Sequence, residues 1–130
     1  MREKVIEQKL VIEGRFPGLN EYTAAQRKNR FEGNKMKRGY TGVVYYEAKR
    51  QLRGVHFGRP VAVHFHFVEK DRRRDLDNIS GFAHKVIFDG LVEAGVIKDD
   101  GWSEVATISD SYDVDKKQPR IEVTIEEAET

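Results

Sequence analysis

Alternation of apolar and polar side chains across PVAVHFHFVE, residues 60–69, is the feature that most restricts the fold. Successive side chains of a β-strand point to opposite faces of a sheet, so every second residue shares a face. The apolar side chains that share one face here are Val61, Val63, Phe65 and Phe67. Because such a face needs another layer packed against it, the segment predicts a strand in a sheet that carries helices.

Weaker patterns on either side of this strand predict the other elements. Loosely alternating residues indicate strands at 4–13, 104–112 and 119–127. Apolar residues at helical spacing indicate helices at 40–53 and about 78–94. Residues 26–38 have six basic residues, one acidic residue and no apolar period, which indicates a loop or a frayed helix start. The expected order is β-α-β-α-β-β, an α+β fold with two main helices on a four-stranded, mostly antiparallel or mixed sheet.

Length and composition limit the class of protein. A chain of 130 residues is expected to form one domain, 1–130. It has no cysteine, which excludes disulfide scaffolds, zinc–thiolate sites and cysteine nucleophiles. No apolar run approaches the ~18 residues of a membrane span, and the charged start MREKVIEQKLVIEGR is unlike a signal peptide. We therefore expect a cytoplasmic protein with no membrane partner.

Charge is divided unevenly along the chain, although the formal net charge is only +1. Residues 1–74 carry 18 Lys and Arg against 8 Asp and Glu, a net +10, whereas residues 75–130 carry 5 against 14, a net −9. A basic surface attracts phosphate, and carboxylates can hold divalent cations that bind phosphate. The asymmetry suggests a nucleic-acid partner, and the ordinary alternative is that the two halves pair as solvated surface.

Asp75 and Asp77 stand two residues apart at the start of the second expected helix. If residues 75–77 are extended, both carboxylates leave the same face and point into one small volume. Two like charges so placed repel each other, and one pKa must rise unless a cation neutralises the pair. The hard cations Mg²⁺ and Mn²⁺ prefer such oxygen ligands. The pair therefore indicates a divalent-metal site, and the ordinary alternative is helix capping, for which Asp77 is the candidate.

A second acidic pair, Asp99 and Asp100, follows the same helix. A helix of about 16 residues is ~24 Å long, and extended residues 95–100 cover ~20 Å. The chain can therefore run back along the helix and bring one of these aspartates near Asp75 and Asp77. The ordinary alternative is a surface turn, because Asp-Asp-Gly is a common turn sequence.

Lys85 lies on the same expected helix, eight residues after Asp77 and about 12 Å further along its axis. Helical side chains lean toward the N-terminus, which shortens that gap for the ammonium group. A lysine so placed can stabilise a phosphate oxyanion or a leaving group. The ordinary alternative is a surface ion pair with Asp89 at i+4.

Three runs in this region together resemble the RusA family of Holliday-junction resolvases. The runs are RDLDN (74–78), KVIFDGL (85–91) and AGVIKDD (94–100). The family pattern is D-x-D-N, then K-x-x-x-D-x-L in a helix, then A-G-v-x-x-D-D. The match is dense over residues 74–100 and looser toward the turn at residues 14–20 and the C-terminal strands. The resemblance implies a RusA-like nuclease domain.

Members of this family are small, dimeric, Mg²⁺-dependent endonucleases, often encoded by prophages, and the resemblance implies the same activity in DNA recombination and repair, with Mn²⁺ as a substitute ion. It implies metal-binding, catalytic aspartates at Asp75, Asp77 and Asp100, and a catalytic lysine at Lys85. Residues of the same motifs expected to support them are Asn78, Asp89 and Asp99. The lysine comes four residues later than in the best-known form of the family, where it falls at Gly81. One extra helical turn moves Lys85 ~6 Å further away.

Branched DNA has no fixed sequence, so we expect it to be recognised by its shape and phosphates. The candidate DNA-binding residues are Lys28, Arg30, Lys35, Lys37, Arg38, Arg72, Arg73 and Arg74. The ordinary alternative for each is a solvated basic surface. Because a four-way junction is pseudo-symmetric, paired cuts indicate a two-fold homodimer.

Two other functions remain open on the sequence. One is a catalytically weak or inactive junction- or DNA-binding protein of the same fold, which the extra turn before Lys85 favours. The other is an acidic-metal hydrolase that acts on RNA or nucleotides. His64 and His66 share a strand face but lack a third evident metal ligand, so we expect them to pack beneath a helix or at a dimer contact. Trp102 is expected to be a core anchor.

Overall fold

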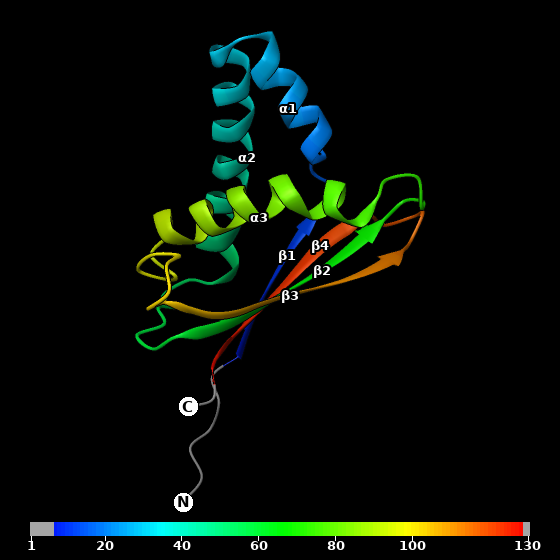
Figure 1. Cartoon of the computed structure of the whole chain (residues 1–130). Helices are drawn as coiled ribbons and strands as arrows, with labels where there is room; N and C mark the ends of the chain where they lie inside the picture. The colour runs from blue at the N-terminus through cyan, green and yellow to red at the C-terminus, as the bar shows by residue number, and fades with distance from the viewer. Residues whose placement is uncertain (1–6, 129–130) are drawn as a thin grey trace, which may run out of the picture.

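The computed structural model describes residues 7–128, in which three helices lie on the same side of a four-stranded sheet (Figure 1). The elements are β1 (Glu7–Glu13), α1 (Leu19–Lys28), α2 (Arg30–Gln51), β2 (Val61–Glu69), α3 (Leu76–Glu93), β3 (Val105–Val114) and β4 (Arg120–Glu127). The α+β class and the four-stranded sheet are confirmed, and the expected order is right except that the first helical region is two helices. Residues 4–6 of the first expected strand lie outside the described part of the chain.

The sheet is mixed and has the strand order β1-β4-β2-β3. β4 pairs antiparallel with β1 and β2, whereas β2 and β3 are parallel. Parallel neighbours need a crossover, and α3 provides it between β2 and β3. β3 therefore ends at the edge of the sheet where β2 ends and α3 begins. This topology places side chains of β3 beside the first turns of α3.

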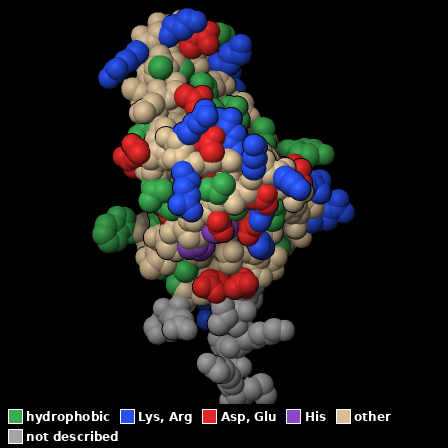
Figure 2. Space-filling view, turned by 90° about the vertical axis from the view of Figure 1, so that its right-hand side faces the viewer, with side chains coloured by type: hydrophobic (Ala, Val, Ile, Leu, Met, Phe, Trp, Pro, Cys, Tyr) green, Lys and Arg blue, Asp and Glu red, His purple; other side chains and the backbone are tan. Residues whose placement is uncertain are grey.

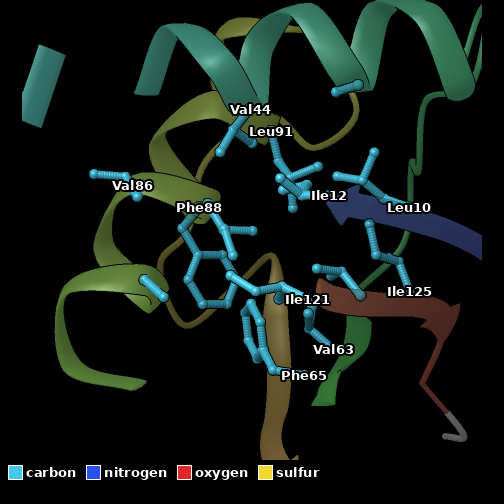
Figure 3. Close-up of a cluster of buried hydrophobic side chains, with 14 of the residues drawn as sticks. Leu10, Ile12, Val44, Val63, Phe65, Val86, Phe88, Leu91, Ile121 and Ile125 are labelled. Carbon is cyan, nitrogen blue, oxygen red and sulfur yellow. The ribbon is translucent and has the colours of Figure 1, made fainter. Parts of the chain in front are cut away.

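The apolar face predicted from β2 forms the centre of the core. Phe65 and Phe67 are fully buried, and both rings lie near His84 of α3. The apolar side chains of β1 and β4 extend the layer that Phe65 begins (Figure 3). α2 crosses α3 at close range at Gly90, where an added Cβ would lie 2.5 Å from Cγ1 of Val44. The core therefore fixes α3, and with it the residues at both of its ends, against the sheet.

For residues 26–38 the expectation of a loop is wrong and that of a helix start is nearer, because all of them except Asn29 belong to the end of α1 or to the first turns of α2. The two helices form a hairpin that projects from the sheet (Figure 1). Only Tyr22 of α1 is buried, so the hairpin has no long apolar stripe for a periodicity to detect. A local pattern does mark the second helix: Asn29 is its N-cap, and its side chain accepts a hydrogen bond from the Glu32 amide at 2.8 Å.

The C-terminal end of α3 has the structure that its glycine, Gly95, predicts. Gly95 has φ +78°, its amide donates to Val92, and the Val96 amide donates to Leu91. This is the Schellman arrangement that a glycine at this position predicts. Residues 95–100, expected to be extended, instead form turns and bends, and Trp102, expected in the core, is fully exposed. Across residues 7–128, no helix is both long enough and apolar enough to span a membrane.

Candidate active site

A buried ion pair fixes the loop that leads into α3. Arg74 donates from Nε to Oε1 of Glu69 at 3.1 Å and from Nη2 to Oε2 at 2.9 Å. A third bond runs from Arg74 Nη1 to the backbone oxygen of Phe16 at 2.9 Å. Glu69 ends β2, so these contacts hold the residue before Asp75 against the end of a strand. The side chain of Arg74 thus binds groups within the protein, whereas its neighbours Arg72 and Arg73 are exposed to solvent.

Asp75 and Asp77 lie together in the first turn of α3. Asp75 is the N-cap residue, with φ −67° and ψ 155°, and the helix begins at Leu76. The predictions that residues 75–77 are all extended and that Asp77 is the N-cap are therefore wrong. The Asp75 side chain makes no capping hydrogen bond, and both carboxylates are exposed without an ion-pair partner in the described chain. Helix capping does not account for the pair.

Asn78 fixes α1 to the start of α3. Its Oδ1 accepts a hydrogen bond from the Asn20 amide at 2.8 Å. The contact is close enough that a Cβ at Gly18 would lie 2.6 Å from the same oxygen. Asn78 therefore positions the helical hairpin relative to the two aspartates.

β3 brings another carboxylate, Asp110, beside the middle of α3. Asp110 Oδ1 lies 2.7 Å from Nε2 of His84. Burial raises the pKa of the neighbouring Tyr112, a hydrogen bond with Ser80 lowers it, and the negative charges of Asp110 and Asp77 add to the increase. Tyr112 thus lies within the electrostatic range of both aspartates and keeps its phenolic proton at neutral pH.

Sequence reasoning missed this group on β3. The available clue was Asp110 itself, an acidic residue at the same alternating positions as Tyr112 in the strand expected at 104–112. Assigning it to the site required the parallel pairing of β3 with β2, which places Asp110 opposite Phe65. A hollow of about 270 Å³, which Arg72 and Tyr112 help to line, lies between the 71–76 loop and the end of β3.

Asp99 and Asp100 lie at the opposite end of α3. Asp100 lines a hollow of about 550 Å³ together with Val92 near the end of the helix. Val92 is 15 residues after Asp77, about 22 Å along the axis. The expected return of residues 95–100 along α3 does not occur. It is β3 that runs back from the end of α3 toward its start.

Within one copy of the chain, Asp100 therefore lies far from Asp75 and Asp77, the other two expected metal-binding aspartates. No group of three or more His, Cys, Asp or Glu residues within 7–128 lies close enough together to hold a metal ion. Asp99 accepts a hydrogen bond from the Asp100 amide at 2.8 Å, which is an ordinary turn contact.

Lys85 is exposed and makes no ion pair within residues 7–128. Its expected partner, Asp89, instead lies 3.5 Å from Lys37 of α2. Gly81, one turn earlier on the same side of α3, faces α1, where an added Cβ would lie 3.1 Å from Leu19. At 100° per residue, Lys85 is turned by about 80° from Asp77 and lies about 12 Å further along the axis. Its ammonium group has no ion-pair partner among residues 7–128, and its position on the helix is rotated from that of the aspartate.

The remaining basic candidates fall on two surfaces. Exposed side chains of the hairpin are Lys28, Arg30, Lys35 and Arg38, with the partly exposed Lys37 beside them. Arg72 and Arg73 are exposed in the loop before Asp75. Figure 2 views the molecule from the right-hand side of Figure 1. It shows Lys and Arg side chains at the end of the hairpin, and Lys and Arg mixed with acidic side chains lower down.

His64 and His66 lie on the sheet face that the helices leave open, so the expectation that they pack beneath a helix is wrong. Their Nε2 and Nδ1 atoms, respectively, lie 2.7 and 2.6 Å from Oγ of Ser111. These contacts bind neighbouring strands together.

Comparison with known proteins matches the chain to a family model. The family model described as "Endodeoxyribonuclease RusA" matches residues 18–126, which is most of the chain. The match includes the start of α3 with its two aspartates, the acidic turn after it, and β3 and β4. No curated protein matches the chain significantly.

Proposed function

The chain belongs to the RusA endodeoxyribonuclease family, and from this premise we propose that it is a structure-selective endonuclease that resolves four-way DNA junctions by Mg²⁺-dependent hydrolysis. The observation that carries the proposal is the pair of exposed carboxylates, Asp75 and Asp77, which face solvent at the start of α3 and serve neither as cap nor as ion-pair partner. The work of such an enzyme lies in DNA recombination and repair, in the cytoplasm, on host or prophage DNA.

The donor atoms at this position fit a magnesium ion. Both side chains offer only carboxylate oxygens, the ligands that Mg²⁺ and Mn²⁺ prefer. Asp75 is held by the neighbouring Arg74–Glu69 ion pair and Asp77 by the helix itself. When bound, the ion supplies an activated water and neutralises charge on the phosphate. The residues of the chain then orient that phosphate and stabilise its developing charge, which is the role proposed for Lys85.

Asp100 can join Asp75 and Asp77 only from a second copy of the chain. The two ends of α3 are about 27 Å apart in one copy, and no third ligand lies beside the pair. A two-fold homodimer can place Asp100 of the partner subunit at Asp75 and Asp77, and the reverse contact follows from the same symmetry. We therefore propose that the metal site is completed across a dimer. This also provides two sites for the paired cuts that a four-way junction needs.

The DNA would bind along the exposed cations of the hairpin and the loop. α1 is ten residues long, so the hairpin end stands about 15 Å from the start of α3. Contacts at both places span several base pairs, since successive pairs rise by about 3.4 Å. Arg72 and Arg73 contact phosphate next to the aspartates, whereas Arg74 acts by holding the loop. Lys37 binds DNA only if it leaves its contact with Asp89.

A synthetic four-way junction tests the proposal, with linear duplex, flap and RNA substrates as controls. We expect symmetric nicks in the junction only with Mg²⁺ or Mn²⁺, and at least a 100-fold loss of cutting in Asp75→Asn or Asp77→Asn with junction binding retained. Glu13→Gln, an exposed carboxylate on β1, is the matched control and should cut normally. Full activity in either aspartate variant would refute the site.

A second function has one observation in its favour. Gly81 occupies the position of the family lysine, and Lys85 is turned away from Asp77. A junction-binding protein that has lost cleavage would show this arrangement. Metal-independent binding to the junction, with no nicks under any of the ion conditions, would support it over the endonuclease.

A further inference from the structure

The face of α3 that carries Asp77 continues to His84. Seven residues separate them, so His84 is turned by only about 20° from Asp77 and lies about 10 Å further along the axis. Helical side chains lean toward the N-terminus, and because Asp77 and His84 lean alike, their separation along the axis stays about 10 Å. His84, and not Lys85, is therefore the side chain aligned with the aspartate.

Asp110 determines which imidazole nitrogen carries the proton. A carboxylate can only accept a hydrogen bond, so His84 Nε2–H donates to Asp110 Oδ1 across 2.7 Å. The neutral ring then has its lone pair on Nδ1, which has no partner within the described residues. A carboxylate that holds an imidazole in one tautomer leaves the other nitrogen free to accept a proton.

The surroundings keep the ring in one orientation and leave it accessible. The ring of His84 packs on Phe65 of β2 with centroids 4.5 Å apart, and Phe67 lies 6.1 Å away. The side chains of His84 and Asp110 are 27% and 23% exposed, so solvent reaches the pair. Other charged or titratable groups near this face are Asp77 and Lys85 of α3 and Tyr112 of β3. Tyr112 is neutral at pH 7, so Asp110 and Asp77 are the nearby anions.

From this geometry we propose that His84 is a catalytic residue, the acceptor of the proton from the attacking water, and that Asp110 is its positioning residue. The inference rests on the proposed endonuclease function. Water oxygen forms a bond to phosphorus while its proton passes to Nδ1 of His84. The bond from phosphorus to the leaving oxygen breaks, and that oxygen takes up a proton from solvent. The products are a phosphate monoester and an alcohol, and His84 then returns its proton to solvent.

Single-turnover cleavage of a four-way junction across pH 5.5–8.5 tests the assignment, with saturating protein and Mg²⁺. We expect His84→Gln to cut roughly 100-fold more slowly or worse, as loss of a general base does, and to bind the junction within threefold of wild type. The wild-type rate should rise with pH and level off, and this rise should flatten in the variant. His66→Gln, a histidine on the opposite sheet face, is the matched control and should retain both rate and profile.

Two further measurements keep the test decisive if His84→Gln is poorly folded. Asp110→Asn alters only a partly exposed side chain of an edge strand, and it should slow cleavage and change the pH profile because an amide no longer fixes the tautomer. Added imidazole should restore part of the activity of His84→Ala but none to Asp77→Asn.

Wild-type rate and profile in both His84→Gln and Asp110→Asn would overturn the assignment while leaving the endonuclease intact. Absence of cleavage by the wild-type protein would overturn the proposed function, and this assignment with it.

Discussion

Arg74 and Glu69 form a two-pronged ion pair with side chains only 12% and 7% exposed. Arg15 approaches the same carboxylate at 3.6 Å, and Arg74 also binds the backbone of Phe16. The pair therefore joins the end of β2, the loop before α1 and the residue that precedes Asp75. The sequence shows Arg74 as one of three consecutive arginines, but only this one is internal.

Removing Arg74 should destabilise the fold, because Glu69 would be left as a buried charge with little compensation. We expect Arg74→Ala to lower the free energy of unfolding by about 3 kcal/mol or more. Arg73→Ala, whose guanidinium is almost fully exposed, should change it by about 0.5 kcal/mol or less. Urea denaturation measures both. Equal effects in the two variants would contradict the distinction between a structural Arg74 and a surface Arg73.

Close packing of α2 on α3 should make Gly90 intolerant of a side chain. A Cβ there would lie 2.5 Å from Val44 Cγ1 and 3.1 Å from the Tyr45 backbone nitrogen, so Gly90→Ala should cost about 1–3 kcal/mol. Gly39→Ala is the matched control, since its Cβ meets nothing within 4 Å in the middle of α2. It should stabilise the protein by up to about 1 kcal/mol. Thermal unfolding of the two variants should therefore shift in opposite directions.

Glu122 should contribute to stability in a pH-dependent way. A hydrogen bond from Lys9, followed by one from Arg120, holds the pKa of Glu122 below its usual value of 4.5. A carboxyl whose pKa is lowered in the folded state stabilises it above the ordinary pKa, and that stabilisation is lost as the pH falls through the lowered value. Glu122→Gln should thus cost about 1 kcal/mol at pH 7 and progressively less below pH 4.5.

The control for this effect is Glu126→Gln, four residues along the same strand. Glu126 makes no ion pair within residues 7–128, so its replacement should change the free energy of unfolding at pH 7 by about 0.5 kcal/mol or less. A Glu122→Gln effect that stays constant from pH 7 to pH 3 would show that the charge of Glu122 does not act as described.

Lys and Arg side chains that contact phosphate should make the affinity for the junction more dependent on salt concentration. Each phosphate contact releases counterions and contributes about 0.9 to the slope of log affinity against log salt. We expect Lys35→Ala, on the projecting hairpin, to reduce that slope by about that amount. Lys9→Ala, whose ammonium pairs with Glu122 on the open face of the sheet, should leave it unchanged. Equal slopes in wild type and Lys35→Ala would remove this part of the hairpin from the DNA-binding surface.

The parts of the fold that the sequence predicts are those with a repeating pattern or a special backbone position. The alternation of Val61 to Phe67 identifies β2, and Gly95 marks the end of α3, because each depends on a local rule. The hairpin was missed because a helix that projects from the body buries few residues and shows no apolar period. The choice of Asp75 and Asp77 as candidate metal ligands also rests on local information, since two carboxylates two residues apart before a helix predict a cation site.

The misplaced parts of the site depend on topology. The distance between Asp100 and Asp77 is set by the length of α3 and by turns at 96–104, and neither periodicity nor spacing determines the direction in which the chain leaves a helix. The same holds for Asp110, which reaches His84 in the middle of α3 only because β3 pairs in parallel with β2. Long-range strand pairing is the information that local patterns lack.

The central claim, a metal site shared between two copies, is tested most directly by mixing two inactive variants. Asp77→Asn and Asp100→Asn should each fail to cut a four-way junction alone. After subunit exchange, about half of the dimers carry one of each, and each of these regains one intact site beside one doubly altered site. The account predicts that nicking returns to about a quarter of the wild-type level, without paired cuts. No recovery, in a mixture where differently tagged subunits are shown to have exchanged, would contradict it.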